Sequence, residues 1–270
     1  MRTSLLPISL VAVLASAPPL FAHEFWISPE RYSVAPGEAI TAEIRVGQNF
    51  EGAGYAYFPM RAERFDLVVG GDAVLVEGRL GDRPALNQSY PADGLVIVVH
   101  ETTDNILTYT NWDQFQAFVE HKDLEDTLAR HTARGLPETG FGESYRRYAK
   151  SLIAVGSGEG ADREVGLETE IVAGMNPYTG DLSAGMPVQV LFQGKPRADA
   201  QIELFAKDAS GEVTITLHRT DAEGRAVLPV APGTEYLVDS VKMIELPNDD
   251  PDAGPVWKSL WASLTFRVPD

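Results

Sequence analysis

The chain has 270 residues, a formal net charge of −17 and no cysteine, so disulfides, thiolate metal ligands and a cysteine nucleophile are excluded. Nucleic acid and anionic membrane surfaces are poor partners for so acidic a protein, because both are bound mainly through Lys and Arg. Hydrophobic residues make up 44% of the sequence, which is enough for the cores of one large or two ordinary domains.

The first 22 residues have the pattern of a secretory signal peptide. Arg2 gives the amino end a positive charge, and the run from Leu5 to Ala22 has none. This run is too short and too rich in proline for a membrane span. Cleavage after Ala22 satisfies the preference for a small residue at the cut, and the mature chain then begins at His23. We therefore expect an exported protein, periplasmic or secreted, with no stable membrane insertion after cleavage.

Residues 23–160 mostly show the alternation of apolar and polar side chains that is typical of short strands. The clearest segments are residues 40–46, a hairpin over 65–77 that turns at Gly70 and Gly71, and residues 95–100. These features predict an immunoglobulin-like β-sandwich domain over residues 23–160.

The apolar spacing changes between Asn111 and Gly135. Apolar side chains recur there three and four residues apart, with acids and bases between them. That period is typical of amphipathic helices, so we expect one or two helices inserted at about residues 111–135 of the first domain.

Residues 161–270 contain further short strand patterns, at residues 188–192, 201–205, 214–218, 225–229, 236–241 and 263–268. Their spacing predicts a second β-sandwich. With its turns at residues 194–196 and 220–225, this half resembles the prealbumin-like sandwich found as an accessory module in exported proteins. The expected fold is therefore mainly β, with two immunoglobulin-like or prealbumin-like β-sandwich domains and a short helical insertion in the first.

Two histidines are the candidate metal ligands. His23, as the first mature residue, would offer its amine, the next backbone amide and its imidazole to a late first-row ion such as copper or nickel. A first residue with no role in metal binding is the alternative. His100 ends an apolar strand and is the expected second ligand. The sequence has no H-x-H or H-E-x-x-H pair, so it carries no zinc signature.

The other histidines give weaker signals. His121 and Glu125 lie four residues apart on one face of the expected helix, a spacing that can bind metal, although a solvated face is favoured. His131 and His218 are expected at the surface. No G-x-S-x-G motif and no set of nucleophile, base and oxyanion donors is present, so no enzymatic activity is predicted.

Four stretches, residues 23–29, 46–52, 146–152 and 257–266, resemble an uncharacterised bacterial family. Its members are often labelled NikM-like or NikK-like, after a nickel-transport periplasmic component. Many of them start with a histidine, an acid and an aromatic residue, which His23, Glu24 and Phe25 match. Many also have a histidine before the methionine of a late strand, where this chain has Lys242 before Met243.

The resemblance implies a periplasmic accessory protein that binds a divalent transition metal, nickel, cobalt or copper, and assists its uptake by a membrane transporter. The alternative is a non-catalytic β-sandwich module that binds protein or carbohydrate at the cell surface.

Overall fold

The computed structural model describes residues 23–91, 93–124 and 126–270. The described chain is mainly β, as the alternating sequence pattern predicts. The expected signal peptide, residues 1–22 with its cut after Ala22, lies outside the described residues. In the part of the chain that is described, no helix has the length and apolar character needed to cross a membrane.

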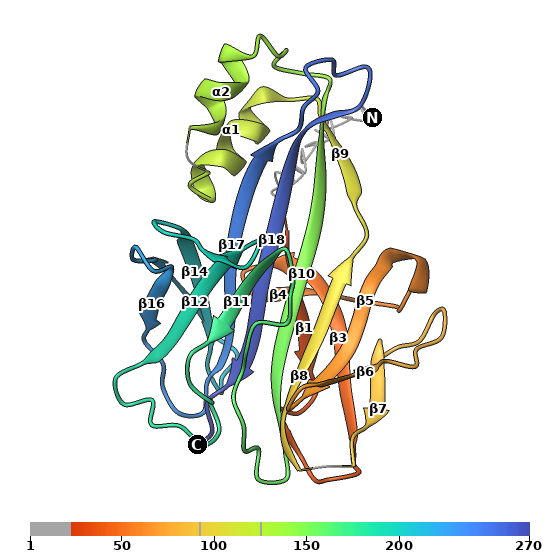
Figure 1. Ribbon diagram of the computed structural model, residues 1–270, viewed down its shortest axis with the longest axis vertical. Coiled ribbons are helices and arrows are strands. Elements are labelled where there is room, and N and C mark those ends of the chain that lie inside the picture. The colour runs from red at the N-terminus through yellow and green to blue at the C-terminus, as the bar shows by residue number, and fades with distance from the viewer. Residues whose placement is uncertain (1–22, 92, 125) are drawn as a thin grey trace, which may run out of the picture.

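A large sheet of ten strands forms the centre of the molecule (Figure 1). Its main path is β15 (Val213–Arg219), β14 (Gln201–Lys207), β17 (Glu235–Glu245), β18 (Pro255–Arg267), β10 (Phe141–Val155), β8 (Gly94–Thr102), β5 (Ala62–Val69) and β6 (Asp72–Leu75). Two more strands, β2 (Ser33–Val34) and β9 (Asn105–Tyr109), pair with β10. Strands β10 and β18 run parallel, with Tyr145 opposite Ser259. The two expected sandwiches therefore share one sheet, and the boundary near residue 160 stays a prediction.

Two smaller sheets cover the central one. The first contains β1 (Glu24–Pro29), β3 (Ala39–Gln48), β4 (Glu51–Tyr55) and β7 (Leu86–Ser89); the second contains β11 (Thr169–Ala173), β12 (Met186–Phe192), β13 (Lys195–Pro196) and β16 (Arg225–Leu228). On β10, Ala149 and Ile153 belong to the core of the first sheet, whereas Tyr148 and Leu152 belong to the core of the second. Because neighbouring side chains of a strand point to opposite faces, the two sheets lie on opposite faces of the central sheet.

This arrangement explains the continuous apolar run in β8. Residues 95–99 are each at most 4% exposed. They alternate between the two cores, so both faces of the strand are covered. A one-turn 3-10 helix, η1 (Pro59–Arg61), precedes β5.

The two helices, α1 (Trp112–His121) and α2 (Thr127–Ala133), lie at one end of the long strands β10, β17 and β18 (Figure 1). They confirm the helical insertion expected at about 111–135. Phe115 and Phe118 of α1 are buried, and Phe118 stacks on Trp261 with ring centroids 5.5 Å apart. The helices therefore close this end of the core.

The first turn of α1 is capped by Asn111, whose side-chain oxygen accepts a hydrogen bond of 2.8 Å from the backbone amide of Asp113. We expect Asn111→Ala to lower the free energy of unfolding by about 1 kcal/mol, because that amide loses its partner. Urea unfolding followed by circular dichroism measures the loss. Asn111→Asp can accept the same bond, and a loss as large as that of alanine would contradict the capping role.

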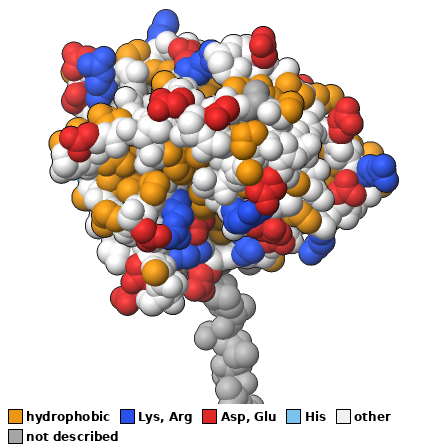
Figure 2. Space-filling view, turned by 90° about the horizontal axis from the view of Figure 1, so that it is seen from below, with side chains coloured by type: hydrophobic (Ala, Val, Ile, Leu, Met, Phe, Trp, Pro, Cys, Tyr) orange, Lys and Arg blue, Asp and Glu red, His pale blue; other side chains and the backbone are white. Residues whose placement is uncertain are grey.

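The end of the molecule away from the helices shows acidic and basic side chains interspersed with apolar ones (Figure 2). The negative charge of the chain is therefore not gathered into one block on this face. Three other acidic side chains, Glu24, Glu203 and Asp239, are buried inside the molecule near the end of α1.

Candidate metal centre

Three buried carboxylates meet on one face of the central sheet, near the end of α1. Glu203 on β14 and Asp239 on β17 lie directly opposite each other in the antiparallel ladder. Glu24, the first residue of β1, approaches them from the covering sheet. Their exposed fractions are 2%, 1% and 5% in that order, so the acids are removed from water. Buried carboxylates require a compensating charge.

Lys122, the residue that caps α1 at its carboxyl end, supplies that charge. Its Nζ lies 2.7 Å from Glu203 Oε2, 3.0 Å from Asp239 Oδ2 and 3.1 Å from Glu24 Oε1. Burial by itself would lower the pKa of Lys122, but the three carboxylates outweigh burial and raise that pKa well above its ordinary value. One ammonium ion thus serves three acids.

The pKa values of two of these acids shift in opposite directions. Burial raises the pKa of Asp239 to about 7, against the opposing charge of Lys122. Burial also acts on Glu203, but the hydrogen bond of His121 and the charge of Lys122 outweigh it and lower its pKa. When all three carboxyls are ionised, the lysine balances one of them. Two negative charges are then left, and a divalent cation would neutralise both.

His121, the last residue of α1, connects this cluster to solvent. Its Nε2 lies 3.1 Å from Glu203 Oε1, and its side chain is 56% exposed. The hydrogen bond to Glu203 raises the pKa of the imidazole. An ion arriving from solvent would therefore meet His121 first and the buried acids behind it.

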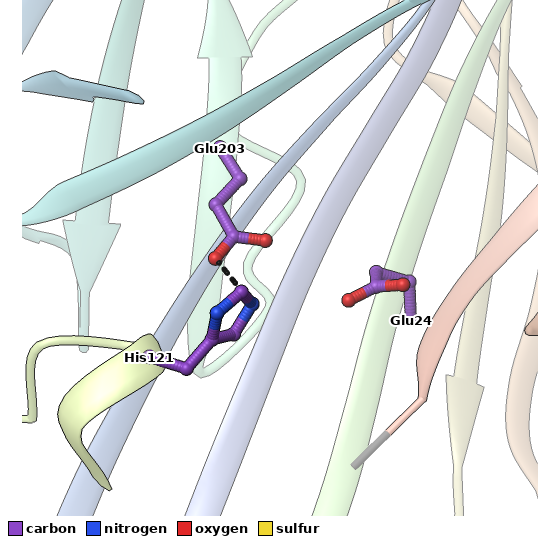
Figure 3. A group of neighbouring side chains, drawn as sticks. All are labelled: Glu24, His121 and Glu203. Atoms are coloured by element: carbon purple, nitrogen blue, oxygen red, sulfur yellow. Dashed lines mark ion pairs between the residues drawn. The ribbon is translucent and has the colours of Figure 1, made fainter. Parts of the chain in front are cut away.

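Figure 3 shows His121, Glu203 and Glu24 approaching one another from α1, β14 and β1. One ligand atom of each lies within 4.8 Å of those of the other two. An imidazole nitrogen with two carboxylate oxygens suits divalent transition metals. Asp239 Oδ1, next to them, is buried and has no hydrogen-bond partner among the described residues. The donor set therefore fits a metal ion in type, charge and spare bonding capacity.

The two histidines chosen from the sequence lie elsewhere. His100 is buried on β8, with its ring 5.0 Å from that of Phe65 and 5.4 Å from that of Phe25. Burial lowers its pKa to about 3. His100 lines one surface hollow, and His23, which precedes β1, lines another. The two hollows have Tyr145 and Arg147 in common. The pairing of His23 with His100 as metal ligands stays a prediction.

The structure also corrects one expectation. His131 was expected at the surface, but it is only 1% exposed. Trp257 Nε1 donates a 3.0 Å hydrogen bond to its Nδ1, and its Nε2 lies 3.0 Å from the carbonyl oxygen of Pro137. Both ring nitrogens are engaged, so the residue is structural. His218, on β15, is partly exposed, with Nε2 2.8 Å from Thr216 Oγ1.

His121 was weighed with Glu125, which lies outside the described residues. The partners that the structure gives it, Glu24 and Glu203, come from distant strands. Glu203 lies between Ile202 and Leu204 in an alternating strand pattern. Such a pattern predicts a solvated side chain, so no local signal identifies Glu203 as a buried acid.

The fold and the site define a β-sandwich protein with a buried acidic cluster that can hold a cation. The chain belongs to the family described as "Domain of unknown function (DUF4198)", whose model matches residues 20–242. No curated protein sequence matches the chain.

Two solved structures are similar to this chain. The D0-D1 domain of Intimin is 13% identical, with a TM-score of 0.22 over 90% of this chain and 97% of that one. A tetra-tandem repeat in the extending region of a large adhesion protein is 10% identical, also with a TM-score of 0.22. That match covers 91% of this chain and 49% of the other, so this chain spans about half of that structure's length.

Proposed function

We propose that the protein binds a divalent transition metal ion through Glu24, His121 and Glu203, outside the cytoplasm, and passes it to a membrane uptake system. The observation that carries the proposal is the meeting of these three ligand atoms within 4.8 Å, beside a cluster with more acids than bases. The chemistry required is capture and release, with no covalent step.

The position of Lys122 suits a site that has to be both empty and filled. Its ammonium ion neutralises part of the buried acid when no ion is bound, so the cluster is stable in both states. The half-exposed ring of His121 allows ligand exchange with solvent or with a partner. A deeply enclosed site would release its ion too slowly for transfer.

The identity of the ion and the location rest on the sequence. The pattern of residues 1–22 supports export, and the resemblance to nickel-transport-associated proteins makes nickel and cobalt the first ions to test, with copper as the third. A membrane uptake transporter is the partner that this role requires. No nucleic acid partner is expected of so acidic a chain.

Calorimetric titration of Ni²⁺, Co²⁺ and Cu²⁺ into the mature protein beginning at His23 tests the proposal. We expect binding that His121→Gln weakens by more than roughly tenfold, because even outer partners of a metal site are worth that much. His218→Gln is the matched control, since this histidine is partly exposed and pairs with Ile202, so its side chain points to the face of the sheet opposite to that of Glu203.

A second comparison separates this site from the amino end. One extra residue before His23 blocks chelation by the free amine but leaves Glu24, His121 and Glu203 in place. If that extension abolishes binding and His121→Gln does not, the ion binds at the amino terminus and the proposed ligand set is wrong. If no ion binds the unmodified protein, the metal-binding function itself is wrong.

A further inference from the structure

A second hollow, of about 290 Å³, opens beside β8, and the metal proposal makes no use of it. Five aromatic side chains line it: Phe25, Tyr55, Tyr57, Phe58 and Tyr145. Tyr55 and Phe58 are 47% and 41% exposed, unusually high fractions for such large rings. The volume is near the lower end of small-molecule sites, which start at about 300 Å³. The hollow is thus of a size for a small molecule with a flat apolar body.

The charged residues that line this hollow are Arg61 and Arg147, and no Asp or Glu is among its described lining residues. This is notable in a chain whose net charge is −17. A local excess of positive charge in an acidic protein selects for an anion, because the rest of the surface repels one.

Arg147 is the more informative of the two. Its guanidinium lies 4.8 Å from the ring centroid of Tyr145 and 5.5 Å from that of Phe25. Its Nε is buried without a hydrogen bond, and its Nη2 donates a long bond of 3.4 Å to the carbonyl oxygen of His23. Within residues 23–91, 93–124 and 126–270, no carboxylate forms an ion pair with it.

The preceding residue shows what a paired arginine looks like in the same strand. Arg146 points to the other face of β10 and forms ion pairs with Glu101 at 3.0 Å and Asp104 at 2.6 Å. A guanidinium stays charged in proteins, and a largely buried charge without a counter-ion is costly. Arg147 has only the longer-range attraction of Asp239 and Glu143, and no described carboxylate contacts it directly.

One more polar group faces the hollow without a partner. His100 is 4% exposed, and its Nδ1 is buried and makes no hydrogen bond to a described residue. Burial keeps the ring neutral, since its pKa is lowered to about 3. Thr102 and Asn105 also line the hollow and offer further polar atoms.

We propose that this hollow binds a small organic carboxylate with a flat apolar body. The carboxylate pairs with the guanidinium of Arg147, and the body packs among the aromatic rings. The ligands of the proposed metal centre, Glu24, His121 and Glu203, do not line the hollow.

The test uses benzoate and phenylacetate as probes, with benzamide and phenylacetamide as uncharged comparators of the same shape. Calorimetry on the mature protein is expected to show millimolar or tighter binding of the carboxylates and much weaker binding of the neutral compounds. Arg147→Gln should weaken carboxylate binding by roughly tenfold to hundredfold, the range for a hydrogen bond to a charged group. Arg146→Gln, one residue away on the other face, is the matched control.

Two further variants and one readout keep the result interpretable. Tyr55→Ala removes a half-exposed ring, so this variant should fold, and it should weaken carboxylate binding. It provides the test if Arg147→Gln does not fold. Nickel affinity should be unchanged in Tyr55→Ala, which changes no charge, so failure of this proposal is separable from failure of the metal site. The proposal is overturned if neither carboxylate binds, if the neutral compounds bind as tightly, or if folded Arg147→Gln binds like the parent.

Discussion

Replacement of Lys122 by methionine is expected to destabilise the protein by about 3–5 kcal/mol, the range for breaking a buried ion pair by removing one partner. The variant keeps the length of the side chain and loses the ammonium ion. Glu24, Glu203 and Asp239 are each at most 5% exposed, so no water replaces the lost charge. The folded state must then either hold three uncompensated carboxylates or take up protons.

Urea unfolding of the parent and of Lys122→Met at neutral pH measures the effect. The double variant Lys122→Met, Asp239→Asn is the matched comparison, because it removes one of the unpaired acids. We expect it to be more stable than the single variant. Ni²⁺ should also stabilise Lys122→Met more than the parent, since the ion replaces the missing charge at the ligand set. A loss below about 1 kcal/mol would show that the cluster is not held by its lysine.

Local patterns predicted the fold class because each pattern reports the burial of one segment. The run at residues 95–99 is apolar throughout because both faces of β8 are covered, and Phe115 and Phe118 recur at helical spacing because α1 buries one side. The pairing of β10 with β18 has no such signal. Its partners are far apart in sequence, and a register between distant strands leaves no period in either of them.

The same distinction explains the candidate site. His121 was compared with Glu125, the acid at local helical spacing, whereas its partner in the structure is Glu203, 82 positions along the chain. A lysine such as Lys122 at the end of an amphipathic helix is usually solvated, and only the packing of α1 against the sheet buries it. Glu203 between Ile202 and Leu204 fits the ordinary alternation of a strand with one solvated face, and only the approach of Lys122 and Glu24 to that face buries it.

Under the proposed function, Lys122, which neutralises part of the buried acid, also limits what the site can bind. With the ammonium ion present, the three acids leave room for two more positive charges, so a divalent ion completes the balance. In this arrangement an ion reaches the site past the exposed imidazole of His121, and the buried acids determine which ionic charge the site can balance. Under the proposed function, specificity between nickel, cobalt and copper would depend on the imidazole and on geometry, since carboxylates bind many divalent ions.

Replacement of His100 by phenylalanine is expected to make the protein more resistant to acid. Burial lowers the pKa of His100 from its ordinary 6.5 to about 3. Between these values the unfolded chain binds a proton that the folded chain cannot accept. The stability linked to this residue is therefore fully present above pH 6.5 and is lost as the pH falls toward 3.

The size of the effect follows from about 1.4 kcal/mol for each unit of pKa difference. Between pH 7 and pH 4 the parent should lose about 3 kcal/mol through His100 alone. The phenylalanine ring fits between Phe25 and Phe65 and does not titrate, while the other ionisable groups change alike in both proteins. Urea unfolding at pH 7 and pH 4 should therefore show the difference in stability moving toward the variant by that amount. Parallel pH profiles of the two proteins would mean that His100 is already solvated, or already charged, in the folded state.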